Sequence, residues 1–131
     1  MCGDFDDNEP SDLEARLFAA FQVHAKLLLG ETARTKHEPG SVSAYADRLM
    51  GDALNRALRD SAAADNDKRQ GVFSVQPLVL ARLAGFLASH LPLNEDPMRR
   101  LMEAMMHGYA EAERIGATLG HDHGDGVEHH H

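Results

Sequence analysis

The sequence predicts an all-α protein, an antiparallel four-helix bundle that forms a single domain. Hydrophobic residues make up 43% of the 131 residues and aromatic residues only 5%, with no Trp. Ala and Leu dominate the apolar set and β-branched residues are few, which favours helix over strand. Apolar residues recur at helical spacing in four stretches, separated by short polar or proline-containing connections. Short connections are typical of antiparallel neighbours in a bundle.

The first two helices have recognisable start signals. Ser11 to Glu14 form a capping box, so the first helix is predicted to begin there and to run to about Leu29, or further through Thr35. A break near Gly30 is an alternative for this helix. After a turn at Pro39-Gly40, either Ser41 or Ser43 is expected to cap a second helix that reaches about Ala62. Its predicted inner stripe consists of Val42, Ala46, Leu49, Ala53 and Ala57.

The most apolar stretch, residues 75–91, is predicted to be the central helix, with Ser74 as its cap and Pro77 in its first turn. Arg82 is its only charged residue, and Pro92 ends it. Its length falls short of the roughly 20 apolar residues that span a bilayer, so a buried core helix is expected. One face carries large side chains, namely Val79, Leu80, Leu83, Phe86 and Leu87. The opposite face carries small ones that would let another helix or a partner approach closely, namely Ala81, Ala84, Gly85 and Ala88.

Asn94 is expected to cap the last helix and Gly120 to end it. One face of this helix carries a methionine stripe, which suits either core packing or an adaptable partner surface: Met98, Met102, Met105 and, at its edge, Met106. The expected domain is therefore residues 11–120. Residues 1–10, acidic and without a basic side chain, are expected to form a flexible arm, and residues 121–131 a disordered tail. The final Val-Glu-His-His-His is typical of a cloning scar with part of an affinity tag.

Charge and cysteine content restrict the class of function. The formal net charge of −8 argues against a nucleic-acid partner and an anionic membrane surface, because no basic stripe is present. Cys2 is the single cysteine, so no intrachain disulfide and no multi-cysteine metal site can form. The N-terminal segment does not have the pattern of a secretory signal, and a cytoplasmic location is expected.

Candidate chemistry is sparse. His24 lies on the apolar face of the first helix, and His90 lies at the end of the central helix. These two could act in a metal or proton site, although a hydrogen-bonded structural histidine is the more common case. Glu103, His107 and Glu111 repeat at four-residue spacing, which suits a metal-binding row or a solvated, ion-paired face. His121 and His123 could hold a transition metal weakly.

No nucleophile–base pair, glycine-rich phosphate loop or cofactor fingerprint is present in the sequence. The sequence therefore favours a non-enzymatic regulatory or adaptor protein without a cofactor. We expect it to act through association with protein and to form a homodimer, since a bundle of this size covers one face of the central helix with its own chain and leaves the other for a second subunit. Two alternatives stay open: a metal- or histidine-dependent protein that uses His24 and His90, and an acidic inhibitor that mimics nucleic acid.

Overall fold

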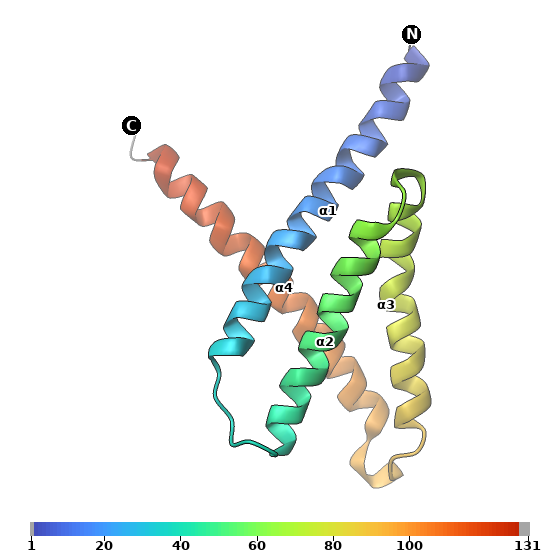
Figure 1. The fold of residues 1–131 in the computed structure, drawn as a ribbon, viewed down its shortest axis with the longest axis vertical. Coiled ribbons are helices and arrows are strands. Elements are labelled where there is room, and N and C mark those ends of the chain that lie inside the picture. Colours follow the sequence, from blue (N-terminus) through green and yellow to red (C-terminus); the bar gives the residue numbers. More distant parts are fainter. Residues whose placement is uncertain (1, 129–131) are drawn as a thin grey trace. The chain divides into compact units, whose positions relative to one another are not determined.

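The computed structural model describes the backbone of residues 2–128 and the side chains of residues 12–119. Four α-helices and one 3₁₀ turn follow one another along this part of the chain (Figure 1). They are α1 (Cys2–Arg34), α2 (Val42–Ala63), α3 (Asn66–Ala88), η1 (Leu93–Glu95) and α4 (Pro97–Glu128). No strand occurs among residues 2–128, so the predicted all-α, four-helix class is confirmed. The chain divides within α3 into two compact units, Met1–Ser74 and Val75–His131.

Helix α1 is longer than the sequence predicts. It begins at Cys2, ahead of the Ser11 capping box, and continues without interruption through Gly30, so the alternative of a break there is wrong. Helix α4 likewise continues past Gly120 to Glu128. The division into arm, domain and tail stays a prediction, because the side chains of residues 1–11 and 120–131 lie outside the described part of the chain.

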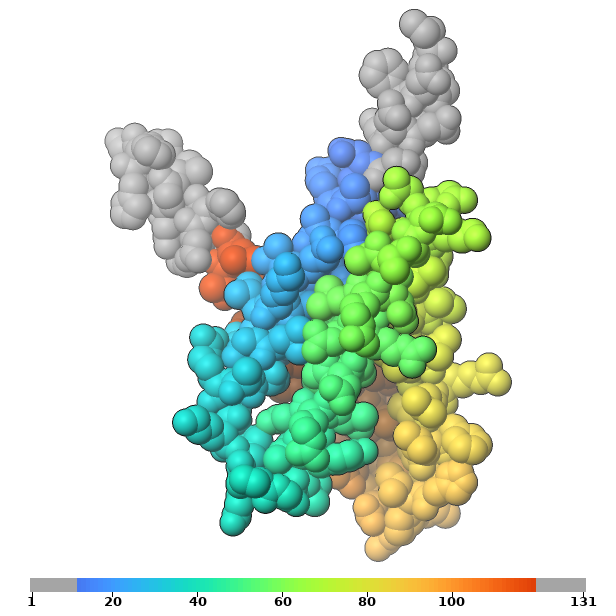
Figure 2. Space-filling model, viewed as in Figure 1, coloured from blue at the N-terminus to red at the C-terminus, as the bar shows by residue number. Residues whose placement is uncertain are grey.

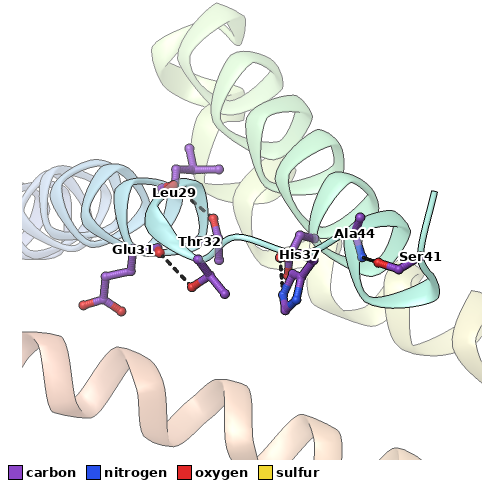
Figure 3. Close-up of polar contacts among 8 residues, drawn as sticks. Leu29, Glu31, Thr32, His37, Ser41 and Ala44 are labelled. Carbon is purple, nitrogen blue, oxygen red and sulfur yellow. Dashed lines mark hydrogen bonds and ion pairs between the residues drawn. The ribbon is translucent and has the colours of Figure 1, made fainter. Parts of the chain in front are cut away.

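The turn between α1 and α2 follows its sequence signals. Gly40 adopts a φ of 82°, a left-handed conformation that glycine enters without strain. The Ser41 hydroxyl accepts a hydrogen bond of 3.1 Å from the Ala44 amide and caps α2, as predicted (Figure 3). His37 Nε2 lies 3.0 Å from Asp47 Oδ2, and this contact ties the connection to α2. Together, these contacts fix where α2 begins.

Replacing Ser41 by alanine is expected to lower the free energy of unfolding by about 1 kcal/mol, because the orphan Ala44 amide loses its acceptor. Ser43→Ala is the matched control, since Ser43 is exposed inside the helix and does not cap it. Urea denaturation followed by circular dichroism measures both. Equal losses in the two variants would contradict the assignment of Ser41 as the cap.

In the first unit, α1 and α2 run antiparallel and pack side by side (Figures 1 and 2). Leu29 Cδ2 of α1 lies 3.8 Å from the position that a Cβ on Gly51 would take. The covered face of α2 agrees with the predicted one only in part, since Val42, Ala46 and Leu49 are exposed while Ala53 and Ala57 are half-buried. The covered residues recur at helical spacing and are Ala44, Asp47, Gly51, Ala53, Leu54, Ala57, Leu58 and Ser61.

Helix α3 begins at Asn66 rather than after Ser74, so most of the predicted polar connection is helical. The backbone oxygen of Asp65 accepts bonds from the amides of Lys68 and Arg69, which starts the helix. Pro77 therefore lies inside α3 instead of in its first turn. A proline at that position cannot donate to the carbonyl four residues earlier, which weakens the helix ladder between Phe73 and Pro77.

In the second unit, α3 ends at Ala88 and α4 begins at Pro97, so Asn94 lies within the 3₁₀ turn and does not cap α4. Asp96 has the left-handed φ of 51°, and its carbonyl accepts the first helical bond from the Arg100 amide at 3.1 Å. Asp96 thus occupies the N-cap position and Pro97 the first helical position, which proline favours.

The predicted burial of the central helix is wrong. Leu83, Phe86 and Leu87 are 50%, 67% and 59% exposed, so the large face of residues 75–91 lies open. The small face is the better covered one, with Ala88 buried and Ala84 and Gly85 half-buried. Among the described residues, the buried apolar side chains are only Ala25, Ala88 and Ile115. The sequence records that this helix is apolar, but not whether the chain supplies enough surface to cover it.

Candidate functional site

The first unit is held together where α2 ends, at a cluster centred on Arg69. The guanidinium donates hydrogen bonds to the backbone oxygens of Ser61 at 2.9 Å, Ala62 at 3.2 Å and Ala64 at 3.1 Å. A fourth bond, of 3.1 Å, goes to Asn66 Oδ1. Ala64 is extended, so no left-handed residue closes α2, and Arg69 satisfies these carbonyls instead. A cation at a helix C-terminus is also favoured by the helix dipole.

Aromatic side chains from α1 and α3 surround the same arginine. The Arg69 guanidinium lies 5.0 Å from the centroid of the Phe18 ring, within range of a cation–π contact. Phe73 meets Phe21 with ring centroids 4.8 Å apart and Phe18 in an edge-on contact at 6.4 Å. An open cleft of about 440 Å³ borders this cluster. It is lined by Glu14, Ala15, Phe18, Asn66, Arg69, Gln70 and Phe73.

The chemistry of this cleft favours a structural role for Arg69. Its guanidinium has five N–H groups, and four hydrogen bonds already commit its donors to the end of α2 and to Asn66. The sequence reasoning missed this residue. A signal was present, because α2 ends without a glycine and a basic residue follows shortly after in the next helix.

The two singled-out histidines lie in different units. His24 is half-buried on α1, in the first unit. His90 is exposed in the second unit, where its Nδ1 lies 2.9 Å from the Phe86 backbone oxygen and its ring packs edge-on against the Phe86 ring at 5.2 Å. His90 therefore contacts the last turn of α3, in agreement with a structural role at a helix end.

The carboxylate and imidazole row on α4 does not form a cluster in the described part of the chain. Glu103 is exposed and its Oε1 lies 3.7 Å from Arg99 Nε. His107 is exposed and Glu111 is half-buried. Over residues 12–119, the structure brings together no three His, Cys, Asp or Glu side chains that could hold a metal ion. His121 and His123 have side chains outside the described residues, so their metal affinity stays a prediction.

Large apolar side chains are exposed on all four helices of the described chain. On α4, Met98, Met102, Met105, Met106 and Tyr109 are each between 54% and 74% exposed. The first four were candidates for partner contact from the sequence, and Tyr109 extends the same face. On α3, the exposed large side chains are Val75, Leu78, Val79, Leu80, Leu83, Phe86 and Leu87. Of the small-residue candidates, Ala81 is exposed and the other three are covered at least in part.

One helix among the described residues, α3, is long and apolar enough to cross a membrane by length and composition alone. The core helix of a soluble protein passes the same test. The prediction that this stretch is too short depended on a start at Ser74, whereas α3 has 23 residues. Arg82 interrupts its apolar part close to the middle.

Comparisons with known proteins leave these observations to stand by themselves: no protein-family model, no characterised protein and no solved structure matches the chain. A function is therefore inferred from the arrangement of the side chains. This arrangement offers a structural arginine cluster in the first unit and open apolar helix faces in the second.

Proposed function

We propose that this protein acts by binding protein through its exposed apolar helix faces, and that its first partner is a second copy of itself. The observation that supports the proposal is the balance of apolar side chains among the described residues. Large apolar side chains are exposed on all four helices, while the buried apolar residues among those described are limited to Ala25, Ala88 and Ile115. Monomeric soluble proteins rarely leave contiguous apolar patches of more than a few hundred Å² open to water. Association covers such area and gains about 25 cal/mol per Å² of apolar surface.

A protein partner fits this surface better than a lipid bilayer. Arg82 would lie near the centre of the membrane if α3 spanned it, at a cost of about 2.5–3.5 kcal/mol. Exposed apolar residues also occur on α1, α2 and α4, between charged residues such as Arg99 and Glu103. A face of this mixed kind suits a helix–helix contact, in which the apolar stripe is buried and the charged flanks keep their water.

The test is the mass of the protein in solution. At micromolar concentration, light scattering coupled to size-exclusion chromatography is expected to give twice the chain mass of 14.3 kDa. The measurement uses the full chain in neutral buffer of physiological salt, so that the net charge of −8 is screened as in a cell. A mass of one chain at every concentration from about 1 to about 100 μM, where a stable dimer would be populated, would count against self-association.

A further inference from the structure

We infer that the second copy docks on α4, through an antiparallel contact of α4 with α4 about a two-fold axis near Met105 and Met106. This inference deepens the proposed self-association and rests on it. At 100° per residue, Met98, Met102, Met105, Met106 and Tyr109 fall within an arc of about 100° on the helix. All five are exposed, and the buried Ile115 lies on a different side of α4.

The order of residues along this face is self-complementary. A two-fold axis at the level between Met105 and Met106 brings Met102 of one copy opposite Tyr109 of the other and leaves Met105 and Met106 of both copies at the centre of the contact. Each methionine sulfur at position 102 would then meet the tyrosine ring of the other copy, a favourable contact for a polarizable thioether. The interface therefore closes with two identical halves, as an isologous contact requires.

Charges beside the stripe favour the same register. Arg99 lies just beyond Met106 at one edge of the methionine face and Glu113 lies on the same half of that face, seven residues before and seven residues after Met106. In an antiparallel pair related by a two-fold axis perpendicular to both helices, each flank faces the same flank of the other copy. Arg99 of one chain then lies opposite Glu113 of the second chain, and the contact occurs twice.

The contacts that Arg99 makes within its own chain leave it available for this pairing. Its Nε lies 3.7 Å from both Asp96 Oδ2 and Glu103 Oε1, and all three side chains are largely exposed. Exposed pairs at such distances contribute little to stability, so exchanging one of them for an intermolecular pair costs little. A parallel pair of α4 helices would instead place Arg99 beside Arg99.

The experiment compares two glutamate substitutions on opposite faces of α4. Met105→Glu introduces a charge at the centre of the proposed contact and is expected to raise the dimer dissociation constant at least about 100-fold, since the dimer carries the change twice. His107→Glu introduces the same residue on the opposite, exposed face and is expected to leave the constant unchanged. Both sites are exposed, so circular dichroism should show unchanged helix content. Sedimentation velocity of the full chain measures the constants.

A charge exchange tests the register. Arg99→Glu and Glu113→Arg should each weaken their own homodimer by roughly tenfold, because like charges then meet in both symmetry-related contacts. An equimolar mixture of the two variants should form a heterodimer close to wild-type affinity, because both contacts again pair opposite charges. Arg100→Glu, next to Arg99 but on the other side of the helix, serves as the control.

The outcomes separate the two proposals. If Met105→Glu dimerises with the dissociation constant of the wild type, the α4 contact is overturned, and the protein self-associates through another face. A wild-type monomer overturns both. A third outcome concerns the register alone. If Met105→Glu dissociates the dimer but the mixed charge variants show no preference for the heterodimer, the antiparallel register is overturned.

Discussion

Replacing Arg69 by alanine is expected to lower the free energy of unfolding by about 2–3 kcal/mol, the range for losing charged hydrogen bonds at partly buried acceptors. The variant leaves the backbone oxygens of Ser61, Ala62 and Ala64 without their donor. It also removes the cation that lies over the Phe18 ring. Because Arg69 joins the start of α3 to the end of α2, the loss should be felt by the first unit as a whole.

Two controls make the measurement specific to the guanidinium. Arg69→Lys keeps the charge near the helix end but not the planar fork that reaches several carbonyls, so it should recover only part of the loss. Lys68→Ala changes an exposed neighbour and is expected to stay within about 0.5 kcal/mol of wild type. Urea denaturation at one fixed protein concentration measures all three, since stability depends on concentration if the chain dimerises. A wild-type midpoint for Arg69→Ala would contradict the capping role.

Replacing Phe73 by alanine is expected to lower the free energy of unfolding by about 2–3 kcal/mol, at or below the usual cost for a core phenylalanine because the side chain is only half-buried. The substitution removes ring contacts with Phe18 and Phe21 and leaves space beside the cleft. These contacts join α1 to the first turns of α3, so their loss should loosen the first unit.

The comparison with Phe86 tests whether this effect depends on place rather than on residue type. Phe86 is a phenylalanine of the same helix that is 67% exposed. Phe86→Ala should cost less than half as much as Phe73→Ala at a concentration where the protein is monomeric. Phe73→Leu, which keeps most of the apolar volume, should recover more than half of the loss. Thermal unfolding followed by circular dichroism measures the set, and equal costs at the two phenylalanines would contradict the aromatic cluster.

Local signals in the sequence predict the helices but not all of their limits. The Ser41 cap and the Gly40 turn are confirmed because each involves residues three or fewer apart, so no distant contact is needed to form them. The starts of α1 and α3 were placed too late, since the capping signals at Ser11 and Ser74 lie inside longer helices. A residue that favours the N-cap position does not mark the start of a helix when the residues before it are also compatible with helix.

The candidate surface was predicted in part. Periodicity selected the methionine residues of α4, and the structure places them on an exposed face together with Tyr109. Arg69 was missed because its hydrogen bonds depend on how α3 turns back after α2, which spacing along one helix does not record. The proposed pairing of Arg99 with Glu113 of a second chain likewise depends on which side of α4 is exposed.

By itself, the amino-acid sequence determined that this protein is helical, where its main turn lies and that residues 75–88 are apolar, because these properties depend on neighbours within a few positions. The tertiary structure decided which side of each helix is covered. On α2 the covered stripe runs from Ala44 to Ser61 instead of from Val42, and on α3 the small residues are covered while Leu83 and Leu87 are open. Burial depends on the area that other helices supply, and periodicity measures only how apolar a face is, not what packs against it.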